Sequence, residues 1–449
     1  MRTIKLIGGA LVLMLTIWSC VKTEPLDLEK DYTKASAERS KSIAEQEAKA
    51  KAEAEAEQEK KWEAYYKMLT DYKQKSWKGE KPFSYMFWAG WVAVEGIDKS
   101  WLQSIPDSTT AIAIWGGYAK EPEELTENQK FDLDIFHKKG SKVVTCYQVS
   151  NVGQGLPGGL ELFIKKYGRE ITAEKETERV QIYARDLARH IIALNFDGFD
   201  IDWEPTIGNH SRAGYAEFVS TNPLYMPVNG YHANMITFIK ELGKYFGARY
   251  EGDERKTHLR NLFDENFAEY HEKEKEYIKK YKPYFEKHNA VDKKFYLLFD
   301  GQFFQMTKEM DKYFDKYVMQ DYGRVDTFSN YLSSWTANDK GSRTPEYYPP
   351  ATRASSTAEF EKGQFTLIID KAKAYKTKNG GVSSYKGELD FATTARDIGF
   401  SNYMNNNHIK FRNYKNYAWM REAMRVMDPR TDQEYGQYKE ELIIRTPKK

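Results

Sequence analysis

Three carboxylic acids stand at alternate positions near the middle of the chain, Asp200, Asp202 and Glu204. On a β-strand, whose side chains alternate between two faces, all three fall on one face. The other face carries bulky apolar residues, namely Phe199, Ile201 and Trp203. Clustered carboxylates repel one another, so the group holds a proton near neutral pH, as general acid catalysis requires. A solvated edge strand is the alternative, but such a face usually alternates Lys or Arg with the acids, and none does here.

The stretch from Asp197 to Glu204 reads Asp-Gly-Phe-Asp-Ile-Asp-Trp-Glu. It resembles the signature strand of glycoside hydrolase family 18, Asp-Gly-x-Asp-x-Asp-x-Glu, at every defining position. The resemblance implies an α/β fold, a (β/α)8 TIM barrel whose fourth strand ends at Glu204, where barrel enzymes keep their chemistry. Asp197 is out of phase with the other acids, so we expect it to brace the start of the strand.

The resemblance also implies a role for each acid. Enzymes of this family lack a protein nucleophile, because the 2-acetamido group of the substrate attacks the anomeric carbon. Carried over, Glu204 is the general acid and then the base, and Asp202 orients the acetamido group and stabilises the oxazolinium intermediate. Asp200 would share a proton with Asp202. Nothing in the sequence requires a metal ion, nucleotide, flavin or other cofactor.

The predicted sixth strand ends in Met319-Gln320-Asp321-Tyr322. Chitinases of the family usually carry Met-x-Tyr-Asp there, with Asp after Tyr. Gln320 and Tyr322 instead resemble the Gln-x-Tyr of family members that cut the chitobiose core of N-glycans, where both residues bond the acetamido group. This fits the need of a charge-developing oxygen for fixed donors.

Three further residues are candidates for substrate binding. Trp115 ends the predicted second strand and either stacks on a sugar ring or packs in the core. Asp300 ends the predicted fifth strand. His210 lies in the loop after Glu204, where it either contacts substrate or is merely exposed.

Short apolar runs alternate with helical stretches along the chain, which is typical of parallel βα units. The predicted barrel strands are 83–88, 109–115, 141–149, 197–204, 295–300, 316–323, 346–353 and 380–385. Helices are expected at 123–139, 176–194, 232–246, 364–375 and 417–427.

A segment at about 250–293, dense in charge and tyrosine, predicts a helical insertion between the fourth and fifth strands. Its His271-Glu272 invites a zinc interpretation. The pattern His-Glu-x-x-His is incomplete, because position 275 is Lys, so a solvated helical face is expected instead.

The N-terminus has the form of a secretion signal, with a basic start and an apolar run from Leu6 to Trp18 that is too short to span a membrane comfortably. It ends in Ile17-Trp18-Ser19-Cys20, which resembles a lipoprotein box in which Cys20 is lipidated. An ordinary signal peptide with an incidental cysteine is the alternative. The only other cysteine, Cys146, then lacks a disulfide partner and is expected in the core of a strand.

Composition divides the 449 residues into four predicted parts. Residues 1–19 are a lipoprotein signal peptide, 20–80 a lipid-anchored spacer with a charged helix, 81–430 the barrel, and 431–449 a C-terminal tail. We therefore predict an exported lipoprotein of a Gram-negative-type bacterium, at the outer membrane or cell surface. Lys plus Arg is 68 against 66 Asp plus Glu, a net charge of +2, which gives no electrostatic case for nucleic acid.

Together these patterns predict an endo-β-N-acetylglucosaminidase that hydrolyses the β-1,4 bond of the N,N′-diacetylchitobiose core, with an N-glycan or glycoprotein as its partner. A chitinase acting on chitin oligomers is the alternative enzyme. A non-catalytic glycan-binding barrel is the alternative from another class, although such family members usually lose the terminal glutamate, and Glu204 is present.

Overall fold

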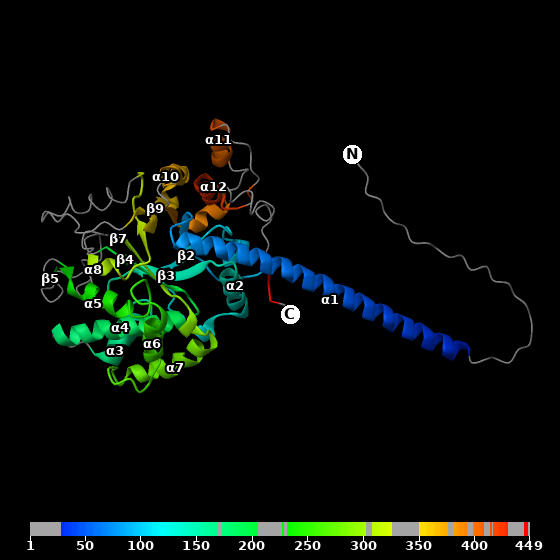
Figure 1. The fold of residues 1–449 in the computed structure, drawn as a ribbon, viewed down its shortest axis with the longest axis horizontal. Coiled ribbons are helices and arrows are strands. Elements are labelled where there is room, and N and C mark those ends of the chain that lie inside the picture. Colours follow the sequence, from blue (N-terminus) through cyan, green and yellow to red (C-terminus); the bar gives the residue numbers. More distant parts are fainter. Residues whose placement is uncertain are drawn as a thin grey trace, which may run out of the picture. The chain divides into compact units, whose positions relative to one another are not determined.

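The structure is a computed structural model, which describes residues 28–168, 173–204, 227–228, 231–301, 308–325, 350–375, 380–392, 398–407, 414, 416–429 and 444–447. The chain divides into two compact units, Met1–Ala64 and Tyr65–Lys449. The second unit contains a barrel of strands surrounded by helices (Figure 1).

Within the described residues, eight parallel strands close into a barrel in the order β1-β10-β9-β8-β7-β4-β3-β2. Their bounds are β1 Phe83–Trp88, β2 Ala111–Trp115, β3 Lys142–Gln148, β4 Gly198–Trp203, β7 Tyr296–Gly301, β8 Lys316–Met319, β9 Ala354–Glu359 and β10 Gly381–Tyr385. The outer helices are α2 Glu127–Lys138, α3 Gly159–Tyr167, α4 Ala173–Ala193, α5 Ala233–Leu242, α8 Lys308–Asp311, α10 Leu367–Tyr375, α11 Ile398–Asn406 and α12 Ala418–Met427. A short antiparallel pair, β5 Pro227–Val228 and β6 Tyr231–His232, stands apart from the barrel sheet. The predicted (β/α)8 TIM barrel is confirmed.

Two separate apolar clusters distinguish the inner and outer faces of the strands. The barrel interior contains Phe83, Tyr85, Phe87, Ala111, Ala113, Val144, Cys146, Leu298 and Val318. The larger core between strands and helices contains Phe199, Ile201 and Trp203 of β4. The predicted phase of β4 is therefore confirmed, because its apolar residues face the helices and its acids face the interior.

The predicted position of the seventh strand, 346–353, is wrong. Residues 351–353 form a single 3-10 turn, 346–349 lie outside the described residues, and the strand is β9. Its sequence, Ala-Ser-Ser-Thr-Ala-Glu, lacks apolar alternation. Its hydroxyl groups can be buried because they are hydrogen-bonded, Thr357 Oγ1 to Ser383 Oγ at 2.6 Å and Ser356 Oγ to Asp321 Oδ2 at 2.5 Å.

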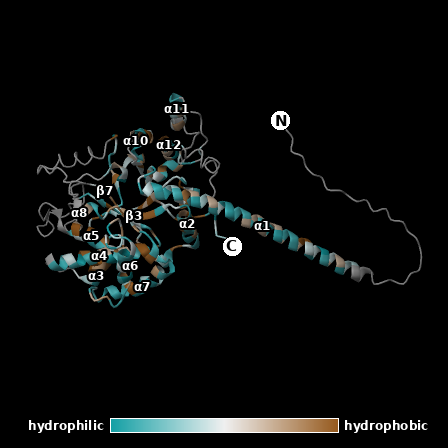
Figure 2. Cartoon of the chain, in the orientation of Figure 1, coloured by the Kyte–Doolittle hydropathy of each residue, from teal (hydrophilic) through white to brown (hydrophobic). Residues whose placement is uncertain are grey.

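Helix α1, Leu28–Trp77, confirms the predicted charged helix, and most of its length is hydrophilic (Figure 2). From Tyr65 onward the helix buries an apolar side. Trp77 stacks on Tyr296 of β7 with ring centroids 3.9 Å apart and meets Phe83 of β1 at 5.1 Å. Tyr296 and Phe83 are the first residues of their strands, so the last turn of α1 covers the amino-terminal end of the barrel.

The predicted insertion is confirmed as two helices, α6 Gly252–Leu262 and α7 Glu274–Lys287. Glu272 is exposed, as expected for a solvated helical face, but Glu274 is fully buried. Arg185 and Arg189 of α4 each bond the Glu274 carboxylate at 2.7 Å. This network fixes α7 on α4, because a buried carboxylate is tolerated only when it is paired.

In the described part of the chain, no helix combines the length and apolarity that a membrane span requires. The predicted signal segment and Cys20 lie outside the described residues, so the lipid tether stays a prediction.

Candidate active site

Strand β4 brings its acids into the barrel interior near the carboxyl ends of the strands. Asp200 and Asp202 have no exposed surface. In register, Cys146 of β3 lies beside Asp200, and Asp300 of β7 lies beside Asp202. The parallel barrel thus gathers three buried carboxyl groups from two neighbouring strands at the end where barrel enzymes carry their chemistry.

Glu204 directly follows the last residue of β4 and is half-buried. Gln148 Nε2 donates a 2.7 Å hydrogen bond to its Oε2. Gln148 ends β3 and lies beside Asp202 in register, so two neighbouring strands hold Glu204 at the barrel mouth. The sequence prediction did not include Gln148. Its signal was present, because it lies two residues after the inward-facing Cys146 and shares that face of the strand.

Asp202 accepts a hydrogen bond from Gln320 Nε2 at 3.2 Å through Oδ1. Its Oδ2 is buried without a hydrogen-bond partner among the described residues. Burial, together with the negative charges of Glu204 and Asp200, raises the pKa of Asp202 well above its ordinary value. A buried oxygen of this kind is available to a substrate group that reaches it.

Asp200 lies deeper, where the Tyr85 hydroxyl of β1 donates a 2.6 Å hydrogen bond to its Oδ2. Burial raises the pKa of Asp200 to about 7, although the Tyr85 hydrogen bond acts in the opposite direction. Asp200 and Asp202 therefore compete for protons near neutral pH, as expected for a pair that shares one.

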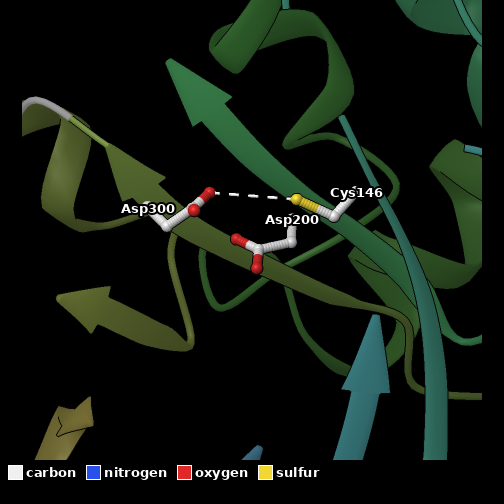
Figure 3. Close-up of side chains that lie close together, drawn as sticks. All are labelled: Cys146, Asp200 and Asp300. Atoms are coloured by element: carbon white, nitrogen blue, oxygen red, sulfur yellow. Dashed lines mark hydrogen bonds between the residues drawn. The ribbon is translucent and has the colours of Figure 1, made fainter. Parts of the chain in front are cut away.

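Cys146, Asp200 and Asp300 offer ligand atoms that lie within 4.8 Å of one another (Figure 3). Thiolate and carboxylate groups can bind zinc, so these residues are the metal candidates among the described ones. Burial and the nearby aspartate charges, however, raise the pKa of Cys146 well above its ordinary value. The protonated thiol donates to Asp300 Oδ1 at 3.9 Å, so we describe the group as a proton-sharing cluster. Cys146 is buried and free, as predicted.

The predicted substrate-binding residues are distributed unevenly. Trp115 is half-buried, with its ring edge-on to Phe87 at 5.7 Å and to Tyr385 at 5.4 Å. Tyr322 meets the same Tyr385 ring at 6.1 Å. These rings form an aromatic side of the mouth, and the sugar-stacking role of Trp115 stays a prediction. His210 lies outside the described residues.

Asp300 is fully buried, and its carboxyl group contacts Gln320 at 2.9 Å and Cys146 rather than open space. Its predicted substrate contact is untested. The observed contacts place it among the groups that support Asp202.

Two other acids of the predicted motifs have structural contacts. Asp197 braces the start of β4, where it accepts from the Val143 backbone at 2.9 Å and pairs with His137 and Lys142. These contacts outweigh its burial and lower the pKa of Asp197. Asp321 pairs with the buried Lys371 at 2.9 Å and accepts from Ser356, so the reversed Asp-Tyr order has a structural cause.

A closed parallel barrel with an acid pair inside one strand and a glutamate at its mouth defines a glycoside hydrolase. Residues 44–257 match the model of glycoside hydrolase family 18, BT1044-like. The family 18 resemblance carried by β4 is thus confirmed.

Solved structures agree with this fold. A glutamate-to-glutamine variant of BT1044 is similar with a TM-score of 0.52 and 18% identity, over 82% of this chain and 93% of that one. An endo-β-N-acetylglucosaminidase from Cordyceps militaris gives a TM-score of 0.40 and 15% identity, over 81% and 95%. A family 18 chitinase from Pseudoalteromonas aurantia gives 0.36 and 12%, over 69% and 95%. No curated protein matches the chain.

Proposed function

We propose that this glycoside hydrolase is an endo-β-N-acetylglucosaminidase that cuts the β-1,4 bond of the N,N′-diacetylchitobiose core of N-glycans. One observation carries the proposal: the Gln320 amide of β8 donates to Asp202, while Gln148 of β3 donates to Glu204. Asp202 and Glu204 are thereby held by fixed donors on opposite sides of β4. This is the support that an acetamido-directed mechanism needs.

In the proposed mechanism, Glu204 protonates the glycosidic oxygen while the acetamido oxygen attacks the anomeric carbon from the other side of the ring. The bond to the leaving sugar breaks and an oxazolinium forms. Asp202 accepts a hydrogen bond from the acetamido nitrogen, and its negative charge offsets the positive ring. The deprotonated Glu204 then takes a proton from water, which attacks the anomeric carbon and restores the original stereochemistry.

The choice of N-glycan over chitin rests on the end of β8. Gln320 faces the acids, and Tyr322 lies on the aromatic side of the mouth beside Tyr385. Asp321, the acid that in a Met-x-Tyr-Asp pattern would follow the tyrosine, is committed to Lys371. The mouth therefore offers an amide where a chitinase of the family offers an acid.

Mass spectrometry of reaction products tests this proposal. The purified chain is incubated with an N-glycoprotein and, separately, with a chitin oligomer. A released glycan that ends in one N-acetylglucosamine, with the other left on asparagine, is the expected result. Chitobiose from the oligomer alone would move the assignment to chitinase, and binding without cleavage would favour a glycan-binding barrel. A Glu204→Gln protein is the blank for contaminating activity.

We also propose that the chain is exported and tethered to a membrane through lipid on Cys20. In a Gram-negative bacterial host fed an alkyne-tagged fatty acid, the wild-type chain should carry the label and sediment with membranes. Cys20→Ala should abolish the label and release the protein, because the thioether site is gone. Cys146→Ala is the matched control, since that thiol is buried in β3 and should leave the labelling unchanged. Persistent labelling of Cys20→Ala would refute the tether.

A further inference from the structure

The side chain of Gln320 uses one nitrogen to contact two acids. Its Nε2 donates to Asp202 Oδ1 at 3.2 Å and to Asp300 Oδ2 at 2.9 Å. An amide nitrogen carries two hydrogens, so each carboxyl group takes one. The shorter contact is to Asp300, which makes Asp300 the closer partner of this amide.

Asp300 is surrounded by acids and weak donors on every packed side. Asp200, Asp202 and Glu204 come from β4, the thiol of Cys146 from β3, the hydroxyl of Tyr85 from β1 and the amide of Gln320 from β8. Burial, and then the charges of Asp202 and Asp200, raises the pKa of Asp300 well above its ordinary value, while the Gln320 hydrogen bond lowers it. No cation among the described residues figures in this balance. A carboxyl group in such surroundings is held in its neutral form at pH 7.

We propose that Asp300 is a positioning residue, a neutral carboxylic acid whose oxygen accepts the hydrogen bond that orients Gln320 toward Asp202. This inference rests on the proposed function, because it gives Asp202 its charged role. Asp300 does not touch the reacting atoms. It acts through the amide, which without this acceptor is free to rotate away from Asp202.

The arrangement meets a specific electrostatic demand. Asp202 needs a fixed donor when its charge develops, and a donor already in place needs no reorganisation at that moment. A second full negative charge on Asp300, which lies beside Asp202 in register, would oppose that charge. A neutral carboxyl group supplies the acceptor without the charge.

Three isosteric side chains at position 300 test the proposal. Asp300→Asn keeps a neutral acceptor for Gln320, so we expect kcat within about threefold of wild type. Asp300→Leu removes the acceptor, so kcat should fall by about 10- to 100-fold with KM nearly unchanged, because a misplaced donor weakens the transition state and not ground-state binding. Rates are measured on whichever substrate the wild-type chain cleaves.

A spectroscopic readout separates this proposal from the assignment of substrate. Infrared difference spectra of protein with 13C-labelled aspartate report protonated carboxyl groups, and Asp300→Asn should remove one such band at pH 7. Leu298→Ala, in the same strand and the barrel interior, controls for general loosening, and circular dichroism and thermal melting check each fold. An Asn variant as inactive as the Leu variant, or an unchanged carboxyl band, would overturn the proposal. A wild-type chain that cleaves only chitin would instead refute the N-glycan assignment and leave this test intact.

Discussion

Replacing Glu204 with glutamine should leave a folded protein whose kcat/KM on a glycoprotein is lower by about 1,000-fold or more. General acid and general base steps each contribute about 10²- to 10⁴-fold, and this one residue supplies both. Glutamine has the same shape, and its carbonyl oxygen can still accept the Gln148 hydrogen bond seen at 2.7 Å. The loss is therefore chemical. Steady-state kinetics, with circular dichroism and a melting curve, measure it.

A change of leaving group separates the two duties of Glu204. An aryl glycoside with an acidic phenol needs little protonation, so the Gln variant should form the intermediate on it faster than on the natural glycan, while the water-attack step stays slow. A burst of phenol followed by slow turnover is the expected time course. Glu161→Gln, on the exposed surface of α3, is the matched control and should behave as wild type. Near-normal turnover of Glu204→Gln on glycoprotein would contradict the mechanism.

The sequence predicts the centre of this site well because strand alternation is a local rule. The acids Asp200 and Asp202 enter the interior, and Trp203 faces the helices, as a period of two requires. Gln320 falls at the end of its strand for the same reason. Each of these placements depends on a residue and its immediate neighbours along the chain.

The partners of those acids could not be predicted in this way. Tyr85 reaches Asp200 across 115 positions of sequence, and Gln148 reaches Glu204 across 56. These contacts depend on the register between strands, which closure of the barrel sets and no local pattern records. Asp300 illustrates the same limit, because its strand end predicts exposure to substrate whereas the register buries it beside Asp202.

The seventh strand was misplaced for a different physical reason. β9 is built of Ala, Ser, Thr and Glu, and such residues carry no hydrophobic signal. It is stable inside the sheet because Thr357 bonds Ser383, and because Ser356 and the Thr357 backbone bond Asp321. Burial by hydrogen bonding is visible only when both partners are in place.

Replacing Asp202 with asparagine should lower kcat by about 100- to 1,000-fold, by a route different from that of Glu204→Gln. In the resting protein, burial and the charges of Glu204 and Asp200 favour the protonated form of Asp202, and asparagine resembles that form. The intermediate demands more, because a positive oxazolinium in a buried site needs a negative partner. Aspartate becomes that partner when its proton passes to Asp200, whose pKa is about 7, whereas an amide cannot ionise.

The leaving group reveals which route operates in the Asp202→Asn variant. An acidic phenol relieves the need for a general acid and does nothing for an unsupported oxazolinium, so this variant should show no burst and should be slow on aryl glycosides and glycoproteins alike. Asp253→Asn, exposed at the start of α6, serves as the control for an aspartate-to-asparagine change and should retain wild-type rates. If the Asp202→Asn protein showed a phenol burst like that of Glu204→Gln, charge on Asp202 would not be needed to form the intermediate. The pairing of Asp202 with Asp200 and Gln320 would then be structural, and the oxazolinium would have to draw its stabilisation from elsewhere in the mouth.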